Sequence, residues 1–118
     1  MRKQQEHKLQ VNIVRFLKLQ YPHVLFNGSL GGQYQKYRSQ QNKGKAAGYR
    51  RGFPDLFIYE PAGKFHGLAI ELKVKGNYAT EAQKEVLQIL NNKGYKAVVC
   101  TGIDETLQTI NDYLRQAK

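Results

Sequence analysis

Three ionisable residues interrupt two short apolar runs in the middle of the chain. Asp55 opens the first run, which extends from Pro54 to Tyr59. Glu71 and Lys73 lie within the second run, LAIELKVK. Side chains alternate between the two faces of a β-strand, so Glu71 and Lys73 point to the same side. If the runs pair as neighbouring strands, about 4.8 Å apart, Asp55 lies beside Glu71.

Two carboxylates at this spacing repel each other unless a positive charge lies between them. Mg²⁺ supplies such a charge, because it takes oxygen ligands and is held by one or two carboxylates together with phosphate and water. A carboxylate-bound metal polarises a phosphodiester and activates a water, and a nearby lysine orients that water or stabilises developing charge. The pattern therefore predicts a hydrolytic site of Asp55, Glu71 and Lys73. The alternative is a structural ion pair of Lys73 with the two acids.

The elements that position these residues follow from the spacing of apolar residues. Residues 4–20 carry apolar side chains at helical spacing before Pro22, and residues 23–27 form a short strand. Strands at 54–59 and 65–74, joined by a turn with Pro61 and Gly63, read as an antiparallel hairpin. A helix follows from Thr80 to about Gly94, then a fully buried strand at 95–100 and a last helix. This order predicts an α/β fold in which helices cover a mixed sheet.

The charge of the chain indicates a polyanionic partner. Its 19 Lys and Arg residues exceed its 9 Asp and Glu residues, which gives a net charge of +10. No acidic residue occurs between His7 and Pro54, and residues 28–52 form a predicted loop rich in Gly, Lys and Tyr. Lysine and arginine bind nucleic acid by neutralising phosphates, although such a loop can also be merely solvated. The candidate nucleic-acid-binding residues are Lys36, Arg38, Lys43, Lys45, Arg50, Arg51 and Lys75.

The motifs in this part of the chain resemble those of a nuclease family. Gly52-Phe53-Pro54-Asp55-Leu56, then Glu71-Leu72-Lys73, then Thr80-x-x-Gln83 resembles the VRR-NUC branch of the PD-(D/E)xK nucleases, over residues 6 to about 101. The resemblance implies a restriction-endonuclease-like fold with Asp55, Glu71 and the main-chain carbonyl of Leu72 as metal ligands. It implies that Lys73 is the catalytic lysine.

Two further residues enter the site by this resemblance. Family members use a glutamate from the first helix, which corresponds to Glu6, and a polar helix residue beside the site, which corresponds to Gln83. Each has a structural alternative. Glu6 in a first helical turn also complements the helix dipole, and Thr80 with Gln83 also forms a capping box. The three histidines do not cluster at ligand spacing, so no zinc site is expected.

We therefore expect a DNA endonuclease that depends on Mg²⁺ or Mn²⁺. Small stand-alone members of this branch are similar to Holliday-junction resolvases, which implies branched DNA as substrate and a homodimer. The candidate dimer interfaces are the loop at 28–52 and the last helix, with Ile110, Tyr113 and Leu114. The alternatives are a non-catalytic nucleic-acid-binding module on the same scaffold, and a nuclease that acts on flaps, ends or RNA.

Length and composition set the remaining expectations. A chain of 118 residues predicts a single domain over residues 1–118. No apolar stretch approaches the roughly 18 residues of a membrane span, and the N-terminus lacks the apolar core of a signal peptide. Cys100, the single cysteine, lies in an apolar run and is expected to be buried in a reducing compartment. We expect a cytoplasmic protein with no membrane partner and no small-molecule cofactor.

Overall fold

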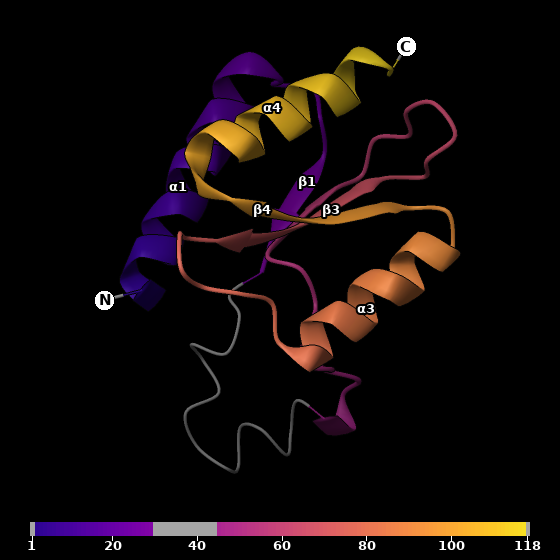
Figure 1. The fold of residues 1–118 in the computed structure, drawn as a ribbon. Helices are drawn as coiled ribbons and strands as arrows, with labels where there is room; N and C mark the ends of the chain where they lie inside the picture. The colour runs from indigo at the N-terminus through magenta and orange to yellow at the C-terminus, as the bar shows by residue number, and fades with distance from the viewer. Residues whose placement is uncertain (1, 30–44, 118) are drawn as a thin grey trace.

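The computed structural model describes residues 2–29 and 45–117 of the chain. Helices and strands alternate along it much as the apolar spacing predicted (Figure 1). Their bounds are α1 Arg2–Gln20, β1 Phe26–Gly28, β2 Leu56–Ile58, β3 Leu68–Lys73, α3 Glu81–Asn92, β4 Lys96–Thr101 and α4 Gly102–Arg115. Of the predicted loop at 28–52, residues 30–44 lie outside the described part of the chain.

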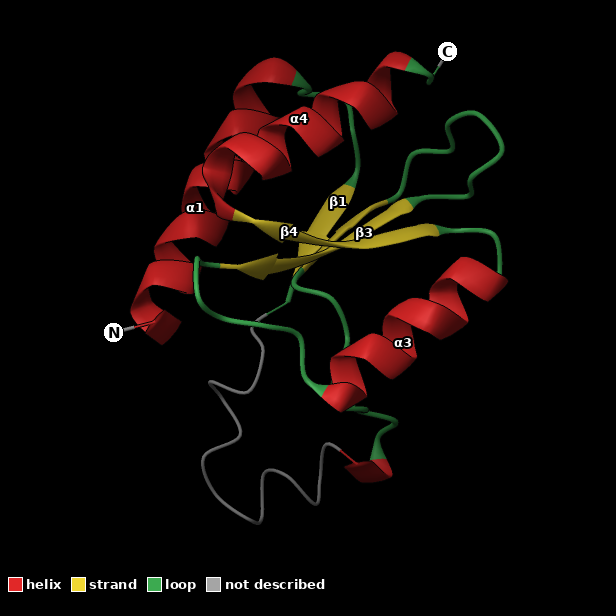
Figure 2. Cartoon of the chain, viewed as in Figure 1, coloured by secondary structure: helices red, strands yellow, loops and turns green. Residues whose placement is uncertain are grey.

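The four strands form one mixed sheet in the order β1-β2-β3-β4 (Figure 2). β1 pairs with β2 and β2 with β3 in antiparallel register, while β3 and β4 are parallel. The parallel pair requires a crossover, which α3 supplies. The predicted hairpin and the predicted mixed α/β sheet are thereby confirmed, with helices α1 and α4 on one face and α3 on the other (Figure 1).

Alternation along β3 divides its side chains between two unequal cores. Leu68, Ile70 and Leu72 are at most 1% exposed and pack in a large apolar cluster with residues of α1 and α4. On the opposite face Ala69 packs in a much smaller cluster, with Leu87 of α3 and Ala97 of β4. The large cluster stabilises the sheet, because each fully buried aliphatic side chain contributes about 1.5–3 kcal/mol. Glu71 and Lys73 lie farther along β3 on the α3 face, outside the small cluster.

The structure corrects two expectations about strands. β2 and β3 are shorter than predicted. Ala62 and Phe65 form only an isolated bridge beside the turn, and the chain then bends at His66 before β3 begins. β4 was expected to be fully buried, but the Val99 side chain is 37% exposed. β4 lies at the edge of the sheet, and Val99 stands opposite Glu71, beyond the small cluster beneath α3. Cys100 is buried as expected, at 1% exposure.

The last helix does not present the apolar surface that was expected of it. Ile110, Tyr113 and Leu114 are 0%, 0% and 7% exposed and belong to the large core. The Tyr113 hydroxyl donates a 2.7 Å hydrogen bond to the carbonyl oxygen of Glu60. The apolar face of α4 is buried in the core of the same chain, so the prediction of a dimer interface on these residues is wrong. Among the described helices, none combines the length and the hydropathy of a membrane span.

Candidate active site

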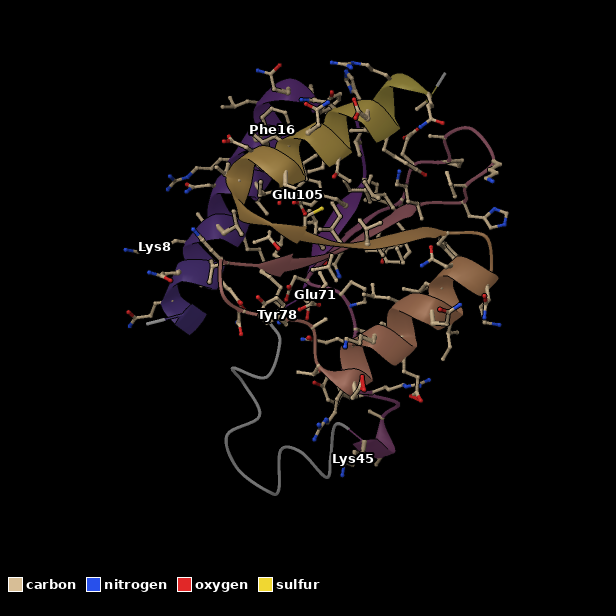
Figure 3. The ribbon with its side chains drawn as sticks, in the orientation of Figure 1. Lys8, Phe16, Lys45, Glu71, Tyr78 and Glu105 are labelled. Atoms are coloured by element: carbon tan, nitrogen blue, oxygen red, sulfur yellow. The ribbon has the colours of Figure 1, made fainter. Side chains whose placement is uncertain are left out.

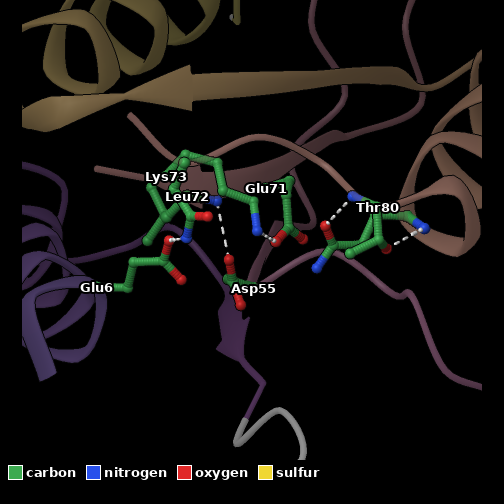
Figure 4. A network of polar contacts seen from close by, with 8 residues as sticks. Glu6, Asp55, Glu71, Leu72, Lys73 and Thr80 are labelled. Atoms are coloured by element: carbon green, nitrogen blue, oxygen red, sulfur yellow. Dashed lines mark hydrogen bonds and ion pairs between the residues drawn. The ribbon is translucent and has the colours of Figure 1, made fainter. Parts of the chain in front are cut away.

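Strand register brings the predicted acidic residues together. Leu56 of β2 pairs with Ile70 of β3 in antiparallel register. Asp55, the residue before Leu56, therefore lies opposite Glu71, the residue after Ile70. Asp55 Oδ2 accepts a 2.8 Å hydrogen bond from the backbone N–H of Leu72 (Figure 4). In an extended strand the N–H and the carbonyl of one residue face the same neighbour. The Leu72 carbonyl therefore lies on the Asp55 side of β3.

Lys73 joins the pair from the same face of β3. Its Nζ lies 3.4 Å from Glu71 Oε2, and the two side chains are 6% and 3% exposed. Among the described residues Lys73 forms no ion pair with Asp55, so the structural ion pair considered from the sequence is present with Glu71 alone. It leaves part of the site unexplained, because Glu71 Oε1 is buried and has no hydrogen-bond partner among the described residues. A buried carboxylate oxygen without a partner is unfavourable, and it is the feature that a bound cation would satisfy.

Burial changes the proton affinity of both acids. It raises the pKa of Glu71 to about 8, and the negative charge of Asp55 acts in the same direction, while Lys73 opposes both. Burial also raises the pKa of Asp55, although the hydrogen bond from the Leu72 N–H lowers it in part. A buried carboxylate and a half-buried one face one ammonium group here, so the protein alone favours a proton on the acidic pair. A divalent cation would replace that proton and stabilise both carboxylates.

Glu6 lies at the edge of this arrangement, on the half-buried side of α1. Its Oε2 accepts a hydrogen bond from Asn77 Nδ2 on the segment after β3 (Figure 4). Its negative charge contributes to the raised pKa of Asp55, as the smallest of the causes. In the part of the chain that the structure describes, no three acidic, histidine or cysteine side chains gather as a ligand cluster. A metal-binding role for Glu6 remains a prediction.

Gln83 forms the capping box that was considered from the sequence. The backbone N–H of Thr80 donates to Gln83 Oε1 at 2.8 Å, and the backbone N–H of Gln83 donates to Thr80 Oγ1 at 3.2 Å. These bonds satisfy two of the free N–H groups at the start of α3. The capping role is confirmed, and a role for Gln83 in the site remains a prediction.

The predicted nucleic-acid-binding residues divide into two groups. Lys36, Arg38 and Lys43 lie outside the described residues. The other four, all exposed, are Lys45, Arg50, Arg51 and Lys75. Arg50 also forms a 2.9 Å ion pair with Glu85 of α3, which ties the end of the loop to that helix. Exposed pairs of this kind contribute at most about 1 kcal/mol, so Arg50 can exchange Glu85 for a phosphate.

Gln10 of α1 is a residue of this site that the sequence reasoning missed. Its Nε2 donates to the carbonyl oxygens of Ser29, at 3.0 Å, and Asp55, at 3.4 Å. The Asp55 carbonyl also accepts a 2.7 Å bond from the Ser29 N–H. Gln10 therefore links α1 to the backbone that carries Asp55. The available signal was its position one helical turn after Glu6, on the same side of the helix.

A mixed sheet that carries two carboxylates and a lysine at one end of a hairpin is the arrangement that the motif resemblance implies for a metal-dependent nuclease. The comparisons with known proteins show the nuclease family to which the chain belongs. The family model of the VRR-NUC domain matches residues 2–104, and the chain belongs to this family. Membership implies a nuclease and, with it, nucleic-acid binding.

A solved structure supports the same assignment. It is described as a VRR_NUC domain protein and superimposes with a TM-score of 0.80 at 32% sequence identity. The match covers 96% of this chain and 90% of that chain, so the similarity extends over the whole fold. Comparison with curated proteins gives no match.

Proposed function

We propose that the protein is a DNA endonuclease that depends on Mg²⁺ or Mn²⁺. The observation that carries this proposal is the partnerless buried Oε1 of Glu71, opposite Asp55. Asp55, Glu71 and the Leu72 carbonyl would hold the metal, and all three are hard oxygen ligands of the kind that Mg²⁺ prefers. When bound, such a metal polarises the phosphodiester and lowers the pKa of a water.

The chain's own residues perform the other parts of the reaction. The hydrogen bond from the Leu72 N–H orients the Asp55 carboxylate, and the buried pair of Glu71 and Lys73 keeps both side chains in fixed positions. The Lys73 ammonium group would orient the attacking water and stabilise the negative charge that develops on the phosphate. The exposed basic residues hold the flanking DNA backbone.

For the substrate we propose branched DNA, such as a four-way junction, and for the active form a homodimer. The support is the resemblance of small VRR-NUC members to junction resolvases, together with the excess of positive charge. We propose that residues 1–118 form a single domain with one site, whereas symmetric resolution of a junction needs two cuts, which a two-fold dimer supplies. Sedimentation should then report about twice the chain mass of 13.6 kDa.

A non-catalytic nucleic-acid-binding module is the second candidate. The conjunction of Asp55, Glu71 and Lys73 in one cluster argues against it, because a surface that only binds DNA does not require a buried glutamate beside a half-buried aspartate. Nucleases that act on flaps, ends or RNA share the same site chemistry and differ in the substrate alone.

Cleavage of labelled DNA tests the proposal. Four-way junctions, flaps, duplexes and single strands are incubated with Mg²⁺, Mn²⁺ or EDTA. We expect metal-dependent cleavage that Asp55→Asn, Glu71→Gln and Lys73→Ala each reduce by at least a hundredfold, as is typical when an electrostatic group of a site is removed. The control is Glu81→Gln, because the Glu81 side chain is 92% exposed on α3. Wild-type cleavage by the Asp55 or Glu71 variant would refute the site.

A further inference from the structure

Two aromatic rings on the segments that adjoin the candidate active site are exposed to solvent. Tyr78, on the segment between β3 and α3, is 80% exposed, and Phe53, two residues before Asp55, is 51% exposed. Figure 3 shows Tyr78 beside the end of the sheet that carries Glu71. Single exposed rings are common on protein surfaces. Two of them on the segments next to one site call for an explanation.

These rings differ from most of the other aromatic residues in their lack of partners. Across residues 2–29 and 45–117, neither Tyr78 nor Phe53 stacks on another ring, and the Tyr78 hydroxyl has no hydrogen-bond partner. The tyrosines with a ring or hydroxyl partner are Tyr21, Tyr59, Tyr95 and Tyr113. Among the described residues, the ring of Tyr78 thus makes no stacking or hydrogen-bonding contact that would stabilise the fold.

The backbone around Tyr78 is nevertheless held in place on both sides. Before it, the Asn77 N–H donates a 3.0 Å bond to the Val74 carbonyl, and the Asn77 side chain donates to Glu6. After it, the Thr80 N–H is bonded to Gln83 of the capping box. An exposed ring on a fixed backbone loses little conformational freedom when it binds a partner, which favours binding.

Phe53 is held in a similar way. Gly52 lies so close to the first turn of α3 that a Cβ there would come within 2.6 Å of the Ala82 carbonyl oxygen, and Pro54 is buried. Tyr78 precedes the N-cap of the same helix by two residues. Both rings therefore project from segments that meet at the start of α3, one leading to Asp55 and the other leading away from β3.

We propose that Tyr78, together with Phe53, stacks on DNA bases with an uncovered face next to the phosphate that is cleaved. The proposal rests on the proposed function, which places that phosphate at Asp55 and Glu71. Aromatic side chains stack on any base, because every base has a π face. In a continuous duplex both faces of a base are covered by its neighbours, so this platform selects DNA in which stacking is interrupted, as at a branch point or in a single strand. The exposed ammonium group of Lys75 lies three residues away on the same segment and can contact the adjoining phosphates.

Binding without cleavage tests the stacking. Fluorescence anisotropy in EDTA compares a labelled oligothymidylate with a blunt hairpin duplex. Loss of one stacked base should weaken oligothymidylate binding by Tyr78→Ala about ten- to a hundredfold, while hairpin binding changes less than twofold. Tyr78→Phe should bind like the wild type, because it keeps the π face. Tyr59→Ala is the aromatic control. Tyr59 is also exposed, at 47%, but it comes directly after β2, whereas Asp55 comes directly before β2.

Three results would overturn the proposal: unchanged oligothymidylate binding by Tyr78→Ala, an equal loss on both DNAs, or a loss in Tyr78→Phe as large as in Tyr78→Ala. Circular dichroism checks that each variant is folded, which the high exposure of Tyr78 leads us to expect. The test is separate from the nuclease proposal. If Tyr78→Ala selectively loses oligothymidylate binding but the wild type cleaves no DNA, the stacking proposal stands and the nuclease proposal fails. If the wild type cleaves DNA but Tyr78→Ala binds oligothymidylate normally, the nuclease proposal stands and the stacking proposal fails.

Discussion

Replacing Gly52 by alanine tests how the candidate site is held in place. Gly52 has a φ of +90°, and a Cβ on it would lie 2.6 Å from the Ala82 oxygen, 2.7 Å from the Ala82 carbonyl carbon and 3.0 Å from the Gln83 nitrogen. All three atoms are backbone atoms of the first turn of α3, so no side-chain rotation can relieve the clash. Either the segment before Asp55 or the start of the helix must move.

The magnitude follows from two contributions. A left-handed conformation costs a residue with a Cβ about 1–2 kcal/mol, and forcing extra volume into a packed contact costs about 1–3 kcal/mol. We therefore expect Gly52→Ala to lower the free energy of unfolding by about 2–5 kcal/mol. Gly102→Ala is the matched control, because Gly102 has a φ of +82° and the added Cβ would meet no atom within 4 Å apart from its chain neighbours and the backbone of its own helix. It should lose the first contribution alone.

Urea denaturation of the two variants measures the difference. The entropy that alanine removes from the unfolded chain is common to both and cancels, so Gly52→Ala should be less stable than Gly102→Ala by about 1–3 kcal/mol. At urea concentrations below its unfolding transition, Gly52→Ala should also lose cleavage activity, because Asp55 shifts away from Glu71. Gly102→Ala should keep its cleavage activity. Equal destabilisation of the two variants would refute the reasoning that the contact with α3 positions Asp55.

Three further predictions concern the metal, the core and the cysteine. Mn²⁺ at a hundred times its dissociation constant should raise the free energy of unfolding of the wild type by about 2.7 kcal/mol, and calorimetry should show no such metal-dependent gain for Glu71→Gln. Tyr113→Phe should cost about 1–3 kcal/mol in urea denaturation, since it leaves the Glu60 carbonyl without its 2.7 Å partner; a neutral result would mean that water replaces the hydroxyl. Burial raises the pKa of the Cys100 thiol, so iodoacetamide at neutral pH should alkylate it in urea and leave it unmodified in the native protein; equal labelling rates would contradict its burial.

The local elements of this protein were predictable because each depends on residues close together in the sequence. Helical spacing predicted α1, and the motif Thr80-x-x-Gln83 predicted the capping box that starts α3. Alternation alone placed Glu71 and Lys73 on the same face of β3. The short turn then made an antiparallel hairpin the natural pairing, which brought Asp55 opposite Glu71.

Tertiary structure decided the features that depend on which surfaces meet. The spacing of Ile110, Tyr113 and Leu114 marks an apolar helix face, but only the packing of α4 shows that this face is buried in the core rather than free for a partner. Likewise the spacing of Gln10 from Glu6 places it on the same side of α1, but only the fold brings it to the Asp55 backbone, 45 residues away. Periodicity reports the direction of a side chain relative to its own backbone, whereas burial and hydrogen bonding depend on the distant segment that packs against it, and neither spacing nor composition contains that information.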